Sequence, residues 1–237
     1  MTEKRNIREA MEPFEDSLES LRQDYAQMRG VYSAAIREIN ARLETLNNEF
    51  SYRNRHNPIH HIESRVKSMP SIIKKLRTIG APISMSSAKK HLHDIAGVRV
   101  VCRYVDDIYR IADLLLAQDD ISLILEKNYI QNPKPNGYRS LHIVVDVPVY
   151  MSHGKLFTPV EIQIRTVAMD FWATLEHGIR YKATEEVPQK IVDELRECAD
   201  VITATDYKMQ EIFKVLQEVH DADDSYQEEI IPEFIQR

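Results

Sequence analysis

The sequence has little of several features that would assign it to a familiar class. Only two cysteines, Cys102 and Cys198, occur in 237 residues, in apolar surroundings and without CxxC spacing. We therefore expect two buried thiols in a reducing compartment, not a disulfide or a metal site. No apolar run approaches the length of a transmembrane helix, and the start, MTEKRNIREAMEPFEDS, lacks the apolar stretch of a signal peptide. A cytoplasmic protein without a membrane partner is the expectation.

A basic excess is also missing. The formal net charge is −6 at pH 7, whereas proteins that bind nucleic acid generally carry an excess of Lys and Arg. We therefore expect no stable nucleic-acid partner, and any anionic ligand must be met by locally concentrated cations. Repeats, low-complexity segments and Gly/Ser linkers are absent, and a hydrophobic content of 43% is ample for one packed core. A single domain spanning 1–237 is expected.

Both ends of the chain carry apolar residues at helical spacing. Residues 12–50 repeat them three or four positions apart with charges between, and a second such stripe occupies residues 188–220. Because each stripe needs an apolar partner, we expect the two helical ends to pack on each other. The acidic tail, residues 221–237, is expected to be loose.

The middle of the chain mixes strand and helix patterns. Strands are expected near 60–67, 98–105, 121–127, 140–150 and 156–166, and helices near 70–79, 108–117 and 167–183. The last two strands are separated by SHGK, which predicts an antiparallel hairpin. The fold class is therefore α+β, with a mixed sheet of about five strands, surrounding helices and long N-terminal and C-terminal helices.

One short helix is predicted to present a cationic side next to a strand. In SRVKSMPSIIKKLRTIGAP, Pro70 suits a first helical turn and Gly80 suits a helix end. The polar set is Arg65 and Lys67 on the strand and Ser71, Lys74 and Lys75 on one side of the helix; the apolar set on its opposite side is Ile72, Ile73, Leu76 and Ile79. Such a turn suits phosphates, although a solvated lysine face would explain the helix alone.

In HDIAGVRVVCRYV, Asp94 precedes a strand that carries Arg99. An ion pair between these two side chains is the simplest structural explanation. A metal-hydrolase site is an alternative, because His93 and Asp94 form an HD pair. Other histidines nearby in sequence are His60, His61 and His91. This alternative is weak, because these histidines lack recognisable metal-site spacings.

The stretch PVEIQIRT predicts a strand with one polar and one apolar face. Glu161, Gln163 and Arg165 alternate with apolar residues, so they point to the same side. We expect helices to cover this strand on both sides. A buried ion pair or a ligand-filled cleft is then needed to satisfy the polar row.

The loop NPKPNG leads into Tyr138 and His142 at the start of the neighbouring strand. The hairpin brings this strand beside Glu161. Convergence with Asp94, Arg99 and the helix lysines indicates a nucleotide–Mg²⁺ site. Two carboxylates suit one hard cation, and several cations suit a triphosphate.

The motifs RVKSMPSIIKK, HDIAGVRVVC, NGYRSLHIVV and VEIQIRTVAMDFWATLEH, followed by RYK, resemble those of RelA/SpoT-type (p)ppGpp synthetases in order and spacing. They cover roughly residues 55–185, the expected catalytic core. The length resembles the small alarmone synthetases, which lack an upstream hydrolase domain and a downstream regulatory region. HNPIHHIESRVKS and NPKPNGYRSLH are closer to the RelP-type than to the RelQ-type branch. The implied fold is nucleotidyltransferase-like and uses no Walker A motif.

The resemblance implies transfer of the β,γ-pyrophosphoryl group of ATP to the ribose 3′-hydroxyl of GTP or GDP. The products would be AMP and pppGpp or ppGpp, the alarmones of the stringent response. The family also suggests Mg²⁺ as cofactor and a homotetramer. Two alternatives stay open: a non-catalytic protein that binds guanine nucleotide or single-stranded RNA on the same scaffold, and a pyrophosphokinase for another 3′-hydroxyl acceptor.

The resemblance also implies roles for individual residues. The ATP-binding set is Arg65, Lys67, Ser71, Lys74, Lys75 and Arg99, of which Arg65 and Arg99 would sandwich the adenine. Asp94 would bind Mg²⁺, and Glu161 would lie near the metal and act as base on the 3′-hydroxyl. The GTP/GDP-binding set is Tyr138, which would stack on guanine, with Lys134, Asn136, Arg139, His142, Gln163 and Arg165. Relatives often carry a basic residue in place of Thr78, and the neighbouring Arg77 points elsewhere on the helix.

Overall fold

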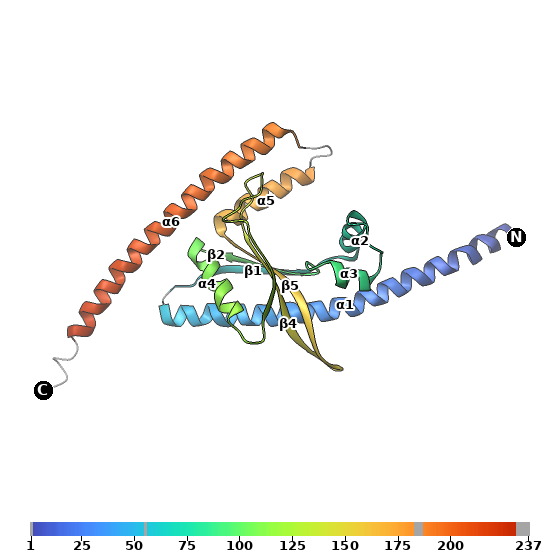
Figure 1. Ribbon diagram of the computed structural model, residues 1–237, viewed down its shortest axis with the longest axis horizontal. Coiled ribbons are helices and arrows are strands. Elements are labelled where there is room, and N and C mark those ends of the chain that lie inside the picture. The colour runs from blue at the N-terminus through green and yellow to red at the C-terminus, as the bar shows by residue number, and fades with distance from the viewer. Residues whose placement is uncertain (1, 55, 183–186, 231–237) are drawn as a thin grey trace.

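The structure is a computed structural model that describes residues 2–54, 56–182 and 187–230 (Figure 1). In chain order the elements are α1 (Thr2–Asn54), β1 (Ile59–Val66), α2 (Met69–Thr78), α3 (Met85–His91), β2 (Ala96–Cys102), α4 (Val105–Leu116), β3 (Ser122–Asn128), β4 (Leu141–Met151), β5 (Gly154–Thr166), α5 (Val167–Lys182) and α6 (Gln189–Ile230). The predicted α+β class with long helices at both ends is confirmed. Among the described residues, no helix combines the length and apolarity needed to cross a membrane.

The strands form one five-stranded sheet in the order β1-β2-β5-β4-β3. β2 and β5 pair in parallel, and the other neighbouring pairs are antiparallel, so the sheet is mixed. The predicted hairpin is confirmed: β4 and β5 pair from Leu141 opposite Ile164 to Met151 opposite Gly154. Gly154 has a φ of 124°, a backbone conformation that favours glycine in a tight turn.

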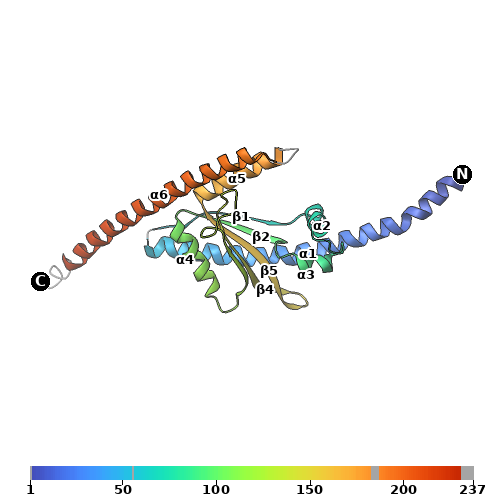
Figure 2. The same cartoon turned by 45° about the horizontal axis from the view of Figure 1, so that its top comes forward.

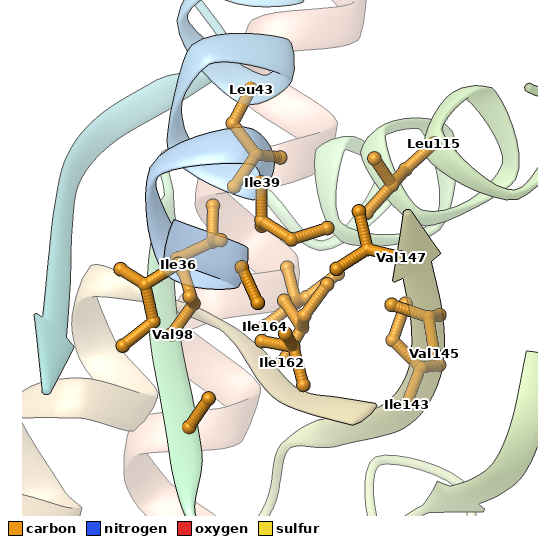
Figure 3. Packing of buried hydrophobic residues seen from close by; sticks show 14 of the residues in the cluster. Ile36, Ile39, Leu43, Val98, Leu115, Ile143, Val145, Val147, Ile162 and Ile164 are labelled. Atoms are coloured by element: carbon orange, nitrogen blue, oxygen red, sulfur yellow. The ribbon is translucent and has the colours of Figure 1, made fainter. Parts of the chain in front are cut away.

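The core lies between one face of the sheet and the helices α1 and α4 (Figure 3). Alternate residues of β4 and β5 point to this face, and α1 supplies an apolar side at helical spacing. The residues that meet there include Ile36, Ile39 and Leu43 of α1, Leu115 of α4, and Val145, Ile162 and Ile164 of the sheet. Burying each such side chain contributes about 1.5–3 kcal/mol. The opposite face of the sheet is thereby left for polar residues.

The expected packing of the two helical ends on each other is wrong. The long helix α1 covers the sheet instead, while α6 packs along α5 and against α4 (Figures 1 and 2). Phe213 of α6 stacks on Tyr104, just before α4, with ring centroids 4.2 Å apart. The sheet offers α1 a larger continuous apolar surface than another helix does, so α1 covers the sheet.

Several boundaries differ from expectation. The strand predicted to reach residue 105 ends at Cys102, because the side chain of Asp107 accepts a hydrogen bond from the Tyr104 backbone (3.2 Å) and starts α4 there. The helix α3 was not predicted, although Ser84 precedes it as an N-cap that accepts from Ser87 N (3.1 Å).

The terminal helices are longer than predicted. α1 begins at Thr2, not near residue 12, and α6 continues to Ile230. Residues 221–230 of the expected loose tail are therefore helical, and residues 231–237 lie outside the described residues.

The prediction of two buried thiols is half right. Cys102 is buried, and burial raises the pKa of its thiol. Cys198 is exposed, because its neighbour Ala199 faces the protein interior and successive residues of a helix are rotated by about 100°. Ile79, expected on the buried side of α2, is 50% exposed at the end of that helix.

Candidate active site

Two rows of facing residues cross the polar face of the sheet. In the first row, the aligned residues from β1 to β3 are Glu63, Arg99, Gln163, His142 and Lys127. In the second, they are Arg65, Gly97, Glu161, Val144 and Leu125. Residues paired across neighbouring strands point to the same side of a sheet. Strand pairing alone therefore gathers side chains that are far apart in sequence.

A first cavity of about 230 Å³ opens over β1, β2 and β5. Its lining includes Glu63, Arg65, Lys67, Asp94, Gly97, Arg99, Glu161 and Gln163. Gly97 leaves its floor open, because a Cβ built there would lie 3.9 Å from the Arg65 carbonyl oxygen, in ordinary van der Waals contact only. Cations and carboxylates alternate around this space, which suits a phosphorylated ligand accompanied by a cation.

Asp94 is the central acid of the first cavity. Lys67 Nζ and Lys75 Nζ lie 2.6 and 2.7 Å from its Oδ2. Burial raises the pKa of this carboxyl, but the hydrogen bonds from both lysines outweigh it, so the pKa is lowered and the carboxylate is ionised. Its other oxygen, Oδ1, is buried and has no hydrogen-bond partner among the described residues. That oxygen is a candidate ligand for a cation bound in the cavity.

Asp94 and Arg99 do not form the ion pair that would have been the simplest structural explanation of the motif. Arg99 instead lies 3.0 Å from Glu63 Oε2 and 3.8 Å from Asp170 Oδ1. The antiparallel register of β1 and β2 places Glu63 directly opposite Arg99, whereas Asp94 precedes β2 and meets the lysines. Arg165 faces Asp170 at 3.1 Å and is almost fully buried under α5. We expected helices to cover both sides of β5. On its polar side, α5 covers Arg165, but Glu161 and Gln163 line the open cavity.

A second cavity of about 210 Å³ lies on the same face toward the sheet edge. Its lining is Leu125, Lys127, Tyr129, Lys134, His142, Val144 and Glu161. Lys134 Nζ stands over the rings of Tyr129 and Tyr138, at 4.7 and 4.6 Å from their centroids. The Tyr138 hydroxyl is 2.8 Å from His142 Nε2. This cavity thus offers aromatic rings and a lysine, groups that suit a nucleobase and its phosphates.

Glu161 lines both cavities. Gln163 Nε2 donates to its Oε2 (3.0 Å), and His142 Nδ1 lies 3.6 Å from its Oε1. Burial raises the pKa of Glu161, but hydrogen bonding to His142 and Gln163 outweighs burial, so the pKa is lowered. An ionised carboxylate between two ligand-sized spaces is suited to accept a proton from one ligand as it meets the other.

Tyr138, predicted to stack on guanine, is not a lining residue of either cavity; it lies beside the second one, in contact with Lys134 and His142.

Several other predicted site residues also line neither cavity. Asn136 donates to Glu176 Oε1 (2.9 Å), and Arg139 pairs with Asp200 (3.2 Å). On α2, Lys74 is exposed and the Ser71 hydroxyl contacts Ser68, which caps the helix. Two further residues weighed for phosphate contact, Arg77 and Thr78, are exposed.

Sequence reasoning missed several lining residues: Glu63, Leu125, Lys127 and Tyr129. Glu63 could have been found, because it alternates with Arg65 along β1 and so shares its face. The residues on β3 carried no such signal, since every position from Ser122 to Lys127 is exposed and no apolar alternation marks a face.

A metal-hydrolase site built from protein side chains alone does not fit. In the parts of the chain that the structure describes, no three His, Cys, Asp or Glu side chains are grouped to hold a metal ion. Mg²⁺ is different, because it is commonly held by one or two carboxylates together with water and substrate phosphates. Asp94 with its unpartnered Oδ1, and Glu161 on the same cavity, match that donor set.

The fold and the site define an α+β protein with two cavities on one face of the sheet that share one carboxylate. Comparison with protein families matches residues 64–186 to the "Region found in RelA / SpoT proteins". GTP pyrophosphokinase YwaC of Bacillus subtilis is 42% identical over 199 residues, covering 84% of this chain and 95% of the relative. GTP pyrophosphokinase YjbM of the same organism is 36% identical over 191 residues, covering 81% and 89%. The chain belongs to the RelA/SpoT family.

Comparison with solved structures gives the same family. The small alarmone synthetase 2 from Bacillus subtilis superposes with a TM-score of 0.73 at 42% identity, covering 81% of this chain and 98% of that chain. The small alarmone synthetase 1 from the same organism, bound to its product pppGpp, gives 0.75 at 34% identity, covering 81% and 98%. The same synthetase bound to AMPCPP gives 0.69 at 31% identity, covering 83% and 99%.

Proposed function

We propose that this protein is a (p)ppGpp synthetase that transfers the pyrophosphoryl group of ATP to the 3′-hydroxyl of GTP or GDP. The observation that carries the proposal is the position of Glu161, which lines both a cation-rich cavity and a cavity with aromatic rings. The base must take a proton from the acceptor hydroxyl where that hydroxyl meets the phosphates of the donor, so it must lie where the two nucleotides meet. The relatives named GTP pyrophosphokinase, and the relative bound to pppGpp, support the same activity here.

In this proposal the first cavity binds ATP. The guanidinium groups of Arg65 and Arg99 are suited to stack on the adenine. Lys67 and Lys75 would bind the phosphates, and Asp94 with Glu161 would hold Mg²⁺. When bound, Mg²⁺ would offset part of the negative charge on the transferred phosphates. The relative bound to AMPCPP supports an adenine nucleotide in this family's site.

In the reaction itself, the second cavity presents the 3′-hydroxyl of GTP or GDP. Glu161 takes the hydroxyl proton while the 3′-oxygen forms a bond to the β-phosphorus of ATP. The bond between this phosphorus and the oxygen bridging it to the α-phosphorus breaks, and AMP leaves with that oxygen. Lys67 and Lys75 stabilise the charge that accumulates on the phosphates. Gln163 and His142 keep Glu161 ionised and oriented for this step.

The experiment that tests the function is product analysis. The protein is mixed with Mg²⁺, ATP and one acceptor at a time: GTP, GDP, GMP, a second ATP or a short RNA. Formation of pppGpp or ppGpp with an equal amount of AMP is the expected result. Tight guanine-nucleotide binding without any product would instead support the non-catalytic alternative. Product formed with another acceptor alone would support the alternative pyrophosphokinase. The RelP-type branch and the choice between GTP and GDP stay predictions.

We also propose that the protein assembles as a closed homo-oligomer, a homotetramer by family resemblance. Exposed apolar side chains gather on the last two helices: Val167, Phe171, Leu175 and Ile179 of α5, and Met209, Ile212, Val215, Leu216 and Val219 of α6. Apolar surface of this extent is commonly covered by a partner, and a symmetric contact closes the assembly. Light scattering at micromolar concentration should give a multiple of the 27.6 kDa chain mass; a monomer would contradict the proposal.

A further inference from the structure

The loop between β3 and β4, residues 129–140, is pressed against the C-terminal helix. Gly137 of this loop is buried and has a φ of 87°. A Cβ built at Gly137 would lie 2.5 Å from the Cβ of Ala199 and 3.3 Å from the Cα of Arg196, both on α6. No side chain fits between the loop and α6 at this point. The small size of Ala199 is therefore part of the same contact.

Polar contacts fix the same loop on either side of Tyr138. Arg139 is held by Asp200 of α6 (Nη2 to Oδ1, 3.2 Å) and donates through Nη1 to the Gly137 carbonyl (3.2 Å). Asn136 donates to Glu176 of α5 (2.9 Å) and accepts from the backbone N–H of Tyr138 (3.3 Å). The loop is thus bonded to both of the last two helices.

Tyr138 itself connects these helices to the second cavity. Its ring packs with a small apolar cluster that is separate from the main core, formed by Trp172, Ala173 and Ala199 with Leu195 and Ile202. Trp172 Nε1 donates to the Leu195 carbonyl (3.0 Å), which ties α5 to α6 within the cluster. On its other side, Tyr138 meets Lys134 and His142, two residues that line the second cavity.

We propose that α6 sets the position of the β3–β4 loop, with Ala199 and Asp200 as positioning residues for acceptor binding. They act through Gly137 and Arg139, since none of the residues that line the two cavities belongs to α6 within the described chain. The first cavity is built from β1, β2, β5 and the residues beside them, so α6 should not affect it. We call the contacts of α6 with Gly137 and Arg139 the loop clamp. The identity of the acceptor nucleotide rests on the proposed function, whereas the loop clamp does not.

The decisive variant is Ala199→Leu, which adds bulk where α6 meets Gly137. Overpacking of this kind displaces the neighbour. We expect the Kd for GTP to rise at least about tenfold and the Kd for AMPCPP with Mg²⁺ to stay within about twofold. Ala199→Ser keeps the size and should bind both nucleotides like the wild type. Asp200→Asn should raise the Kd for GTP by only about threefold, because Asp200 is largely exposed. Isothermal titration of each nucleotide measures these changes.

A matched control disturbs α6 away from the loop. Phe213→Leu loosens the contact of α6 with Tyr104 and His56. It should lower the melting temperature and leave the Kd for GTP within about twofold. If Phe213→Leu weakens GTP as much as Ala199→Leu does, α6 acts through general stability and the proposal is overturned. It is also overturned if a folded Ala199→Leu binds GTP like the wild type, or loses both nucleotides equally.

A readout without any nucleotide is available, because Trp172 is the single tryptophan of the chain. It is buried in the cluster that holds Tyr138. Acrylamide quenching of its fluorescence should increase in Ala199→Leu and not in Ala199→Ser; equal quenching in all variants contradicts a displaced loop. Should Ala199→Leu not fold, Ala199→Val replaces it, with GTP weakened at least about threefold.

The outcome for the loop clamp can be separated from the outcome for the proposed function. If the wild type binds GTP without forming product, the proposed activity is wrong. The Kd for GTP in the variants would still test whether α6 positions the loop. A wild type that binds AMPCPP but not GTP would remove the acceptor role assigned to the loop and with it this proposal.

Discussion

The two cavities lie on the same face of one sheet and share Glu161, but they are held together differently. The first is built on β1, β2 and β5, and two of its cations are already paired with carboxylates, Lys67 with Asp94 and Arg99 with Glu63. The second lies toward the opposite edge of the sheet, at β3, where Lys134 stands over aromatic rings. Its loop is held by helices that come later in the chain.

This difference teaches which parts of each site are fixed before a ligand binds. Strand pairing places the charged groups of the first cavity, and ion pairs keep them in place, as a polyanion with its cation requires. The second cavity depends on a loop whose position is set from outside the sheet. Variants should therefore affect the two cavities separately, except at the residue that they share.

The largest effect should come from Glu161→Gln. The amide keeps the size of the side chain but cannot take a proton at this position. We expect turnover to fall by about 10²–10⁴, equivalent to roughly 3–5 kcal/mol of barrier. Because the amide oxygen can still be a ligand to Mg²⁺, affinities for GTP and for AMPCPP should change by less than about threefold. Steady-state rates with isothermal titration check both parts, and a variant that retains most of its turnover would remove Glu161 from the role of base.

One substitution in the first cavity, at Arg99, and one beside the second, at Tyr138, should separate the two nucleotides. Stacking of a base on a side chain contributes about 1–3 kcal/mol. Tyr138→Ala should therefore raise the Kd for GTP by roughly ten- to a hundredfold and leave that for AMPCPP nearly unchanged. Arg99→Ala should do the reverse. Isothermal titration of both nucleotides measures the changes.

Two controls match these substitutions in chemistry. Tyr150→Ala removes a ring that is 74% exposed near the tip of the β4–β5 hairpin, and Arg103→Ala removes a guanidinium just after β2 that bonds to the Asn57 carbonyl. Neither residue lines a cavity or belongs to the 129–140 loop, so both variants should bind like the wild type. Equal weakening of both nucleotides by Tyr138→Ala would show that the two-pocket assignment is wrong.

Two adjacent lysines of α2 offer a finer test of the first cavity. Lys75 contacts Asp94 at 2.7 Å, whereas Lys74 is exposed, although the sequence predicted that both bind ATP. Lys75→Ala should raise the Kd for AMPCPP by about tenfold, because a hydrogen bond to a charged group is lost. Lys74→Ala should change it by less than about twofold. Equal effects of the two variants would indicate that α2 acts only through its total charge.

The smallest effect concerns pH. The pKa of Glu161 is lowered because hydrogen bonding to His142 and Gln163 outweighs burial. A lowered pKa keeps the carboxylate ionised at neutral pH, and the ionised form is lost only as the pH falls below about 4.3, the ordinary glutamate value. Gln163→Ala removes one donor, so the acid limb of kcat/KM should move to higher pH. An acid limb at the wild-type position would show that Gln163 does not hold this charge.

Much of the site could be predicted from the sequence. The alternation in PVEIQIRT placed Glu161 and Gln163 on one face, because side chains of a strand point to opposite sides in turn. The same logic placed Arg65 and Lys67 together, and both line the first cavity. The motif resemblance indicated the family, which the comparisons confirm. The individual roles of Asp94, Glu161 and the other predicted residues stay predictions.

Local pattern thus determined most of the helices and strands, α3 excepted, and the side to which the polar residues of β5 point, because these follow from backbone geometry and the spacing of neighbours in the chain. Only the tertiary structure decided which residues of distant elements contact each other. An apolar stripe shows that α1 must be covered but not that a sheet covers it, and a charge shows that Arg99 needs an acid but not that Glu63 supplies it. Gly137 has its close contact with Ala199 across more than sixty residues of chain. Such pairings depend on the register and packing of distant elements, which no local spacing encodes.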